Sequence, residues 1–186
     1  MYIGVGSNLG RRGEHIRHGL KMLKKRGFRI VKQSRVYKTK PVAMPGARNF
    51  LNLVVATDTR LSPAACLAEF RAVETALGRG RLRRNAPRTL DLDLLLYGRQ
   101  VLRQRGLTIP HPRMHERMFV LRPLADIAPG LVHPVLRRRV RTLMRRMMND
   151  ECRMTNDNRN SSFVNRHSSG HRPPATVPHR DQWKAR

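Results

Sequence analysis

Apolar residues recur along the chain with two different periods, one typical of strands and the other typical of helices. Four short segments are rich in β-branched residues or leucine, which predicts strands. Two longer segments repeat apolar residues every three or four positions, which predicts amphipathic helices. The resulting order, β-α-β-β-α-β, is that of ferredoxin-like α+β domains, in which helices pack on an antiparallel sheet. The expected strands are residues 2–6, 28–37, 50–57 and 90–97, and the expected helices are residues 14–25 and 62–77.

The composition changes near residue 137. A last helix, rich in Met and Arg, is expected from there to about Met148. Beyond it Asn, Ser, Arg, His and Pro dominate and leave almost nothing to bury, so we expect a disordered basic tail. We therefore divide the chain into a domain of residues 1–148 and a tail of residues 149–186. Three short elements are expected before the last helix: a strand at residues 107–109, a turn at Pro110–Pro112 and a helix near residues 114–121.

Charge is the unusual feature of the composition. The 186 residues include 39 Lys and Arg against 12 Asp and Glu, a formal net charge of +27. Residues 137–186 hold 13 of the basic and 4 of the acidic residues, so residues 1–136 alone carry +18. A basic body of this kind indicates polyanionic partners, such as nucleotide phosphates, nucleic acid or an anionic surface.

The two cysteines, Cys66 and Cys152, match no metal-binding spacing and no CxxC redox motif, so we expect free thiols. No apolar run approaches the roughly 20 residues that span a bilayer, and the chain opens directly on a strand-like segment. We therefore expect a cytoplasmic protein without membrane contact.

The segment Pro87–Tyr97 carries the most informative chemistry. Asp91 and Asp93 stand two residues apart in an apolar run, and strand side chains alternate between faces, so both carboxylates should project to one side and the leucines between them into the core. Paired carboxylates beside Arg88 are typical of Mg²⁺ held against substrate phosphates. The alternative is an edge strand with two solvated surface acids.

Three other features have both a functional and a structural interpretation. The basic loop of residues 79–84 could bind phosphate oxygens through guanidinium groups, although arginine runs are usually solvated. His111 stands between two prolines and could donate to a phosphate, or could be merely structural. Phe50 and Asn52 share a strand face, which suits a flat heterocycle, but Phe50 could equally be a core residue. The spacing of Gly4, Gly6 and Gly10 is not that of a dinucleotide fingerprint, and the chain contains no P-loop.

Taken together, and in this order over residues 2–136, these motifs resemble the 6-hydroxymethyl-7,8-dihydropterin pyrophosphokinase family. The most specific element is Pro87–Leu95. The supporting segments are Gly6–Leu9, Tyr37–Pro41, Phe50–Asn52, residues 74–79, and Thr108–His111 with Arg117 and Phe119.

The resemblance implies a Mg²⁺-dependent transfer of pyrophosphate from ATP to the hydroxymethyl group of the pterin, with release of AMP, in folate biosynthesis. Asp91 and Asp93 would hold two Mg²⁺ ions, and Arg81 and Arg88 would join them as catalytic residues. We expect ATP and the pterin as partners and a monomeric enzyme. The implied ATP-binding residues are Glu74, Arg79, Arg81, Arg88, His111 and Arg117, and the implied pterin-binding residues are Thr39, Val42, Phe50, Asn52 and Phe119.

The chain departs from the family pattern at two places. Asn85 and Ala86 precede Pro87 where the family often has Trp-Gly, in a loop that is one residue shorter, which bears on loop closure over the pterin. Pro112 follows His111, where an aromatic residue that helps to hold ATP can occur.

Two other functions compete with this one. A basic ferredoxin-like sheet could bind RNA, but only 5% of the residues are aromatic and two acids on a strand would repel the RNA backbone. Nonspecific nucleic-acid contact through the basic tail is compatible with either function. A degenerate enzyme that survives as a scaffold is disfavoured by the presence of Asp91, Asp93, Arg88 and His111.

Overall fold

The computed structural model describes residues 1–41, 48–78 and 87–164, and of residues 151 and 154–164 it describes the backbone alone. The strands are β1 (Tyr2–Ser7), β2 (Arg29–Gln33), β3 (Tyr37–Thr39), β4 (Phe50–Asp58), β5 (Asp91–Leu96), β6 (Leu102–Gln104) and β7 (Leu107–Ile109). The helices are α1 (Arg12–Lys25), α2 (Pro63–Ala76), α3 (Met118–Ile127) and α4 (Val140–Val164), with a short 3₁₀ turn at Met114–Glu116.

The main sheet has the strand order β2-β4-β1-β5, and every neighbouring pair is antiparallel. This is the ferredoxin-like order that the sequence predicts, and the expected fold class is confirmed. Strand β3 pairs with the first residues of β4, beside β2 on the same edge, and β6 and β7 form a separate hairpin.

The strand expected at residues 28–37 is broken in two at Ser34. The Ser34 side chain accepts a hydrogen bond from the Val54 N–H at 3.0 Å, while its own N–H donates to the Val54 carbonyl at 3.0 Å. A serine hydroxyl thus replaces a ladder carbonyl, and the regular pairing stops there. The pairing resumes three residues later as β3.

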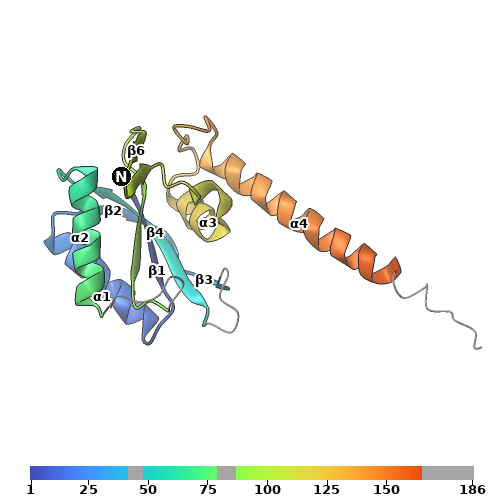
Figure 1. Ribbon diagram of the computed structural model, residues 1–186, viewed down its shortest axis with the longest axis horizontal. Helices are drawn as coiled ribbons and strands as arrows, with labels where there is room; N and C mark the ends of the chain where they lie inside the picture. Colours follow the sequence, from blue (N-terminus) through green and yellow to red (C-terminus); the bar gives the residue numbers. More distant parts are fainter. Residues whose placement is uncertain (42–47, 79–86, 165–186) are drawn as a thin grey trace, which may run out of the picture. The chain divides into compact units, whose positions relative to one another are not determined.

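Helices cover both faces of the main sheet (Figure 1). On one face, α1 and α2 pack against the sheet in a core that includes Ile3, Leu53 and Leu92. On the other face, α3 packs against β4 in a second core, formed around Val54, Leu121 and Leu124. The side chains of Asp91 and Asp93 on β5 lie on this second face, beside the N-terminus of α3.

Two expectations about helix ends have different outcomes. Ser62 caps α2 by accepting from the Ala65 N–H at 3.3 Å, with Pro63 at the first helical position, as predicted. Helix α4 extends to Val164 rather than ending near Met148. Residues 149–164 contain neither Gly nor Pro, so nothing in that stretch stops a helix.

The chain groups into two compact units, Met1–Asn149 and Asp150–Arg186. The expected disorder of the tail beyond residue 164 lies outside the described residues. Within the described part of the chain, none of the helices has the length and apolar character that crossing a membrane requires.

Candidate active site

Asp91 and Asp93 project from the same face of β5, as the strand alternation predicts. The leucines at positions 90, 92 and 94 are buried in the opposite core. Across the β1–β5 pair, Asp91 lies opposite Gly6 and Asp93 lies opposite Gly4. Because glycines have no side chain, the two carboxylates have open backbone beside them rather than a neighbouring side chain.

An arginine contacts each carboxylate. Arg88 Nη1 donates to Asp91 Oδ1 at 2.5 Å, and Arg117 Nη1 lies 3.6 Å from Asp93 Oδ2. All four side chains are between 21% and 35% exposed, so they reach solvent from a partly desolvated position. Charges in such a position interact more strongly than on an open surface, and an incoming polyanion can still reach them.

The two carboxylates on β5 repel each other. Burial raises the pKa of Asp93, the negative charge of Asp91 raises it further, and His111, Arg117 and Arg88 act in the opposite direction. Two like charges on one partly buried strand face are costly unless a cation offsets them. The site therefore favours a bound positive charge.

His111 lies close enough to interact with Asp93. Its own N–H donates to the Leu95 carbonyl at 2.9 Å, which fixes the residue beside β5. Burial lowers the pKa of His111, and the charge of Asp93 partly opposes this effect. His111 Nδ1 accepts from the Arg113 N–H at 3.2 Å, so the neutral imidazole carries its proton on Nε2 and can donate from there.

The donor set fits Mg²⁺. Mg²⁺ prefers oxygen ligands and is commonly held by one or two carboxylates together with substrate phosphates, which is what Asp91 and Asp93 offer. Among the described residues no group of three or more His, Cys, Asp and Glu side chains is arranged to hold a metal.

Asn8 fixes the backbone at Arg88, a role that the sequence did not predict. Asn8 Oδ1 accepts from the Arg88 N–H at 2.7 Å, and the Asn8 and Leu9 N–H groups donate to the Arg88 carbonyl at 3.1 and 3.2 Å. The turn after β1 thus holds the residue that pairs with Asp91. The segment Gly6–Leu9 was recognised as part of the family motif, but the sequence pattern does not show which distant backbone Asn8 contacts.

Glu74 is buried in α2, and Glu74 Oε1 accepts from the Leu92 N–H at 2.8 Å. Leu92 lies between the two aspartates on β5, which is the edge strand of the sheet. An edge strand has unpaired N–H groups, and this carboxylate satisfies one of them. The structure therefore places Glu74 behind the acidic pair, and its expected contact with ATP stays a prediction.

A second polar cluster lies two strands away from Asp91. Asn52 Nδ2 donates to Thr39 Oγ1 at 2.7 Å, and Thr39 lies opposite Phe50 in the β3–β4 pair. Gly6 is the cross-strand partner of both Asn52 and Asp91, so the three residues form one row across the sheet. With strands about 4.8 Å apart, Asn52 and Asp91 are roughly 10 Å apart along that row, with the backbone of Gly6 between them.

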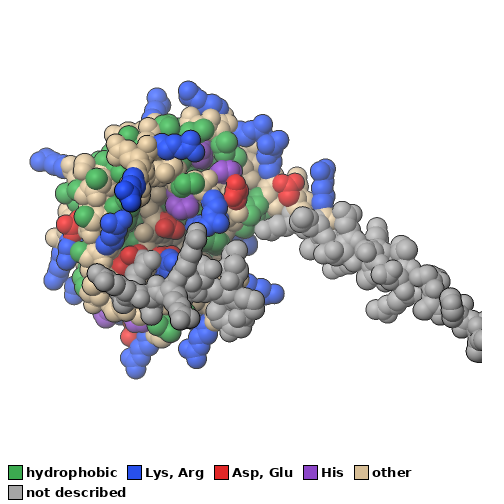
Figure 2. Space-filling view, viewed as in Figure 1, with side chains coloured by type: hydrophobic (Ala, Val, Ile, Leu, Met, Phe, Trp, Pro, Cys, Tyr) green, Lys and Arg blue, Asp and Glu red, His purple; other side chains and the backbone are tan. Residues whose placement is uncertain are grey.

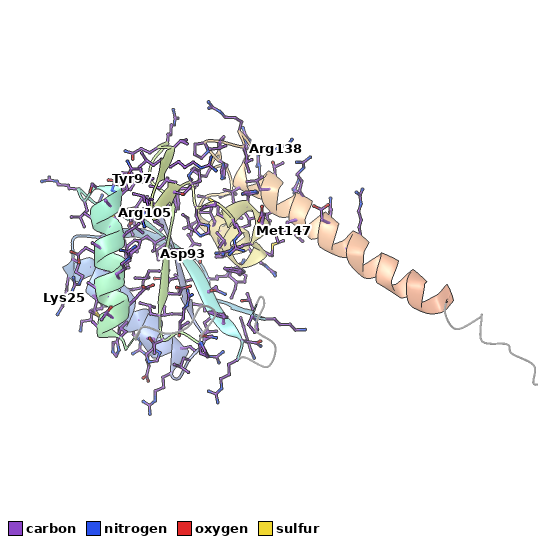
Figure 3. All side chains as sticks on the ribbon, viewed as in Figure 1. Lys25, Asp93, Tyr97, Arg105, Arg138 and Met147 are labelled. Atoms are coloured by element: carbon purple, nitrogen blue, oxygen red, sulfur yellow. The ribbon has the colours of Figure 1, made fainter. Side chains whose placement is uncertain are left out.

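The remaining expected residues divide into two groups. Phe119 lies in the first turn of α3, and the Arg117 guanidinium is 5.5 Å from the centre of its ring, so Phe119 lies beside the arginine that pairs with Asp93. Arg79, Arg81 and Val42 lie outside the described residues. Figure 2 shows acidic, basic and histidine side chains close together near the middle of one face, and Figure 3 labels Asp93.

Comparison with known proteins gives a consistent result. The model of the 7,8-dihydro-6-hydroxymethylpterin-pyrophosphokinase (HPPK) family matches residues 2–129. The chain is 42% identical over 134 residues to the 2-amino-4-hydroxy-6-hydroxymethyldihydropteridine pyrophosphokinase of Haemophilus influenzae, which covers 72% of this chain and 84% of the relative. The Bacillus subtilis protein of the same name is 42% identical over 127 residues, covering 68% of this chain and 76% of the relative.

Longer proteins also match. The folic acid synthesis protein fol1 of Pneumocystis carinii is 41% identical over 135 residues, and the match covers 73% of this chain but only 18% of that protein. A Plasmodium falciparum HPPK-DHPS crystal structure has a TM-score of 0.69 at 14% identity, covering 83% of this chain and 45% of that chain, and it supports the fold alone. The chain thus spans less than half the length of these larger relatives.

The family match covers the strand that carries Asp91 and Asp93, the Asn8 turn, the Thr39–Asn52 cluster and the beginning of α3. The predicted family is confirmed. The chain belongs to the 7,8-dihydro-6-hydroxymethylpterin-pyrophosphokinase family, whose reaction is the transfer of pyrophosphate to hydroxymethyldihydropterin in folate synthesis.

Proposed function

We propose that this chain transfers pyrophosphate from ATP to the hydroxymethyl oxygen of 6-hydroxymethyl-7,8-dihydropterin. A bond forms between that oxygen and the β-phosphorus of ATP. The bond between the β-phosphorus and the oxygen bridging to the α-phosphate breaks, AMP leaves, and the hydroxyl proton passes to solvent. The supporting observation is the acidic pair on β5, with Arg88 on Asp91 and Arg117 on Asp93.

Two Mg²⁺ ions are proposed at Asp91 and Asp93. When bound, Mg²⁺ neutralises phosphate charge and lowers the pKa of a coordinated hydroxyl. The protein residues position the reactants and stabilise charge, which is most of what phosphoryl transfer requires. We propose that Arg88, Arg117 and the Nε2–H of His111 contact the triphosphate. We propose the same role for Arg79 and Arg81. We also propose that Glu74 belongs to the ATP-binding side of the site, where it accepts a hydrogen bond from the Leu92 N–H.

The pterin is proposed to bind over the row formed by Asn52 and Gly6. Asn52 and Thr39 would hydrogen-bond the heterocycle edge, Val42 would add a backbone contact, and the rings of Phe50 and Phe119 would stack on its two faces. The hydroxymethyl arm would then point along the row towards Asp91, over the bare backbone of Gly6.

Residues 1–148 are proposed to form the catalytic domain and to act as a monomer in the cytoplasm. Cys66 and Cys152 are both free thiols, which suits a reducing compartment.

The test is AMP release from Mg-ATP in the presence and absence of 6-hydroxymethyl-7,8-dihydropterin. We expect pterin-dependent AMP formation by the wild-type chain and a loss of about 10²-fold or more in Asp91→Ala and Asp93→Ala, because each removes charge stabilisation at the reacting phosphates. Asp58→Ala is the matched control, since Asp58 is an exposed carboxylate paired with Arg29 at the far end of β4. Release of ADP alone, or equal loss in the control, would overturn the proposal.

A second activity is favoured by the net charge of +27. We propose nonspecific, salt-sensitive nucleic-acid contact through the basic tail. Residues 149–186 hold 7 basic and 4 acidic residues, so their removal should weaken retention of a single-stranded RNA oligonucleotide at low salt and leave AMP formation unchanged. Undiminished RNA retention by the shortened chain would show that the tail is not responsible.

A further inference from the structure

A hydrogen-bond network outside the acidic site joins β3 to the last turn of α3. Tyr37 Oη lies 2.9 Å from each carboxylate oxygen of Asp126. Arg35 adds three contacts to the same carboxylate, from Nη2 at 3.1 Å, from its backbone N–H at 3.3 Å and from Nε at 3.4 Å. The Asp126 carboxylate therefore receives donors from two residues of one segment, 89 and 91 positions earlier in the chain.

Two guanidinium groups also lie near the Tyr37 ring. Arg122 of α3 is 5.2 Å from the centre of the Tyr37 ring, and Arg35 is 5.7 Å from it. The Arg35 side chain is 80% exposed, so water screens its charge and its contribution is small. The side chain of Asp126 is only 18% exposed, and the Tyr37 hydroxyl makes the shortest contacts with its carboxylate, at 2.9 Å.

The position of Tyr37 connects this network to the proposed pterin site. Tyr37 is the cross-strand partner of Asn52, so it ends the row that continues through Gly6 to Asp91. Thr39, which accepts from Asn52, lies two residues further along β3 and therefore on the same face. Strand β3 has three residues, and among the described strands it pairs with β4 alone. So short an edge strand has few backbone bonds of its own to fix its position.

Helix α3, on the other side of the network, is also connected to the proposed pterin site. Phe119, Arg122 and Asp126 are spaced i, i+3 and i+7, which places them on one face of α3. That face contains the ring proposed to stack on the pterin at its N-terminal end and the partner of Tyr37 at its C-terminal end. Helix α3 lies beside both β3 and β4 (Figure 1).

We propose that Tyr37 and Asp126 form a positioning pair that sets the distance between the two walls of the pterin site, with Thr39 and Asn52 on the sheet and Phe119 on α3. This inference rests on the proposed function. Neither residue touches the acidic pair, so the pair should determine pterin affinity and leave nucleotide affinity unchanged.

The test compares the KM for 6-hydroxymethyl-7,8-dihydropterin with the KM for Mg-ATP in the full chain, together with a direct fluorescence titration of the pterin. Tyr37→Phe removes one hydroxyl and keeps the ring. We expect the pterin KM and Kd to rise about five- to tenfold, the range for the net loss of a typical intramolecular hydrogen bond, with the ATP KM changed less than about twofold.

Variants of Asp126 provide a graded series. Asp126→Ala removes the acceptor and should match or exceed the effect of Tyr37→Phe. Asp126→Asn keeps one oxygen that can accept from Tyr37 and should recover part of the pterin affinity. Asp58→Asn is the control, because it weakens a comparable surface contact, with Arg29, at the opposite end of β4. Far-ultraviolet circular dichroism confirms that each variant is folded.

The outcomes separate this inference from the proposed function. Unchanged pterin affinity in Tyr37→Phe and Asp126→Ala would overturn the inference, as would an equal rise in both KM values, which indicates general loosening. If the wild-type chain binds the pterin but releases no AMP, the proposed reaction fails and the titration of the variants still decides the role of the pair. If the wild-type chain binds no pterin, both proposals fall.

Discussion

The backbone of Gly6 lies against the side chain of Asn52, so closely that a Cβ atom at position 6 would come within 2.9 Å of Asn52 Oδ1. The same Cβ atom would lie 3.9 Å from the Cβ atom of Asp91 on the other side. Glycine at this position therefore does two things. It lets the Asn52 amide reach Thr39, and it leaves the backbone bare between the amide and the acidic pair.

We expect Gly6→Ala to raise the KM for the pterin by about tenfold or more and to lower the free energy of unfolding by about 1–3 kcal/mol, since the methyl group must displace Asn52. Steady-state kinetics and urea denaturation measure the two effects.

The matched control for Gly6→Ala is Gly4→Ala, in the same strand and on the same face. A Cβ atom at Gly4 would meet Leu95 at 3.5 Å, an ordinary contact distance. Gly4→Ala should therefore leave the pterin KM within about twofold, because no polar side chain moves. Equal effects of the two substitutions on the pterin KM would contradict the special role of Gly6.

Asn8→Ala should reduce both stability and activity. Asn8 is 1% exposed, and its loss leaves the Arg88 N–H without its acceptor, at a cost of about 1–3 kcal/mol. Asn8 Nδ2 is itself buried without a partner, so removing it offsets part of that cost, and we expect a net loss of about 1 kcal/mol. Activity should fall more than stability implies, because the arginine that pairs with Asp91 loses one of the three hydrogen bonds that hold its backbone.

Thermal unfolding and AMP release test the Asn8 prediction. Gln33→Ala, an exposed amide on β2, is the control and should change stability by less than about 0.5 kcal/mol. An Asn8→Ala variant with wild-type activity would show that the turn after β1 does not position Arg88.

Two glycines of α1 should respond in opposite directions to alanine. A Cβ atom at Gly19 would lie 2.5 Å from Leu90 Cδ2, in the buried core directly behind Asp91, whereas one at Gly13 would have open space around it. Alanine is favoured over glycine in a helix by about 1 kcal/mol, so Gly13→Ala should stabilise by up to that amount. Gly19→Ala should destabilise by about 1–2 kcal/mol, since overpacking exceeds the gain in helix propensity.

Urea denaturation of both glycine variants is the measurement. The pair controls for itself in part, because the substitution and the helix are the same, with Gly13 in the first turn of α1 and Gly19 in its interior. Stabilisation by both would mean that Leu90 moves aside at little cost, and the close packing of α1 behind the acidic strand would be disproved.

The order of strands and helices could be predicted because periodicity is a local property. Period-two alternation placed Asp91 and Asp93 on one face, and the helical spacing from Ser62 to Leu77 located α2. The family motif then supplied the chemistry. The break at Ser34 was missed, because it depends on a bond from Val54, which no local pattern reports.

The register of the strands, and the contacts between residues far apart in the chain, could not be predicted from the sequence. The row of Tyr37, Asn52, Gly6 and Asp91 exists because three strand pairs align at one position, and each alignment joins residues that are far apart in the chain. The partners of Asn8 and Asp126 are of the same kind. Such contacts are set by the packing of whole elements, so single-residue patterns do not contain them.

We expect the free energy of unfolding to depend on pH because of the buried imidazole of His133. Its side chain is 4% exposed, and Nδ1 accepts from the N–H groups of Leu136 at 3.1 Å and Val135 at 3.3 Å, which requires an unprotonated Nδ1. Burial and, secondarily, the charge of His115 lower the pKa of His133. The unfolded chain therefore binds the proton more readily, with a pKa of about 6.5. The stability contributed by neutral His133 should be fully present above that pH and should be lost as the pH falls through the lowered folded-state pKa.

We expect His133→Asn, which cannot titrate but keeps an acceptor oxygen, to lose less stability than the wild-type chain between pH 7 and pH 5. Urea denaturation across that range measures the difference. The ring of His115 is 5.9 Å from that of His133, centre to centre, so His115→Asn is measured beside it. His18→Asn, on the exposed surface of α1, controls for a general loss of histidine charge. If the free energy of unfolding of the wild-type chain and of His133→Asn depended on pH in the same way, the folded and unfolded chains would take up this proton equally. The turn before α4 would then tolerate a charged imidazole.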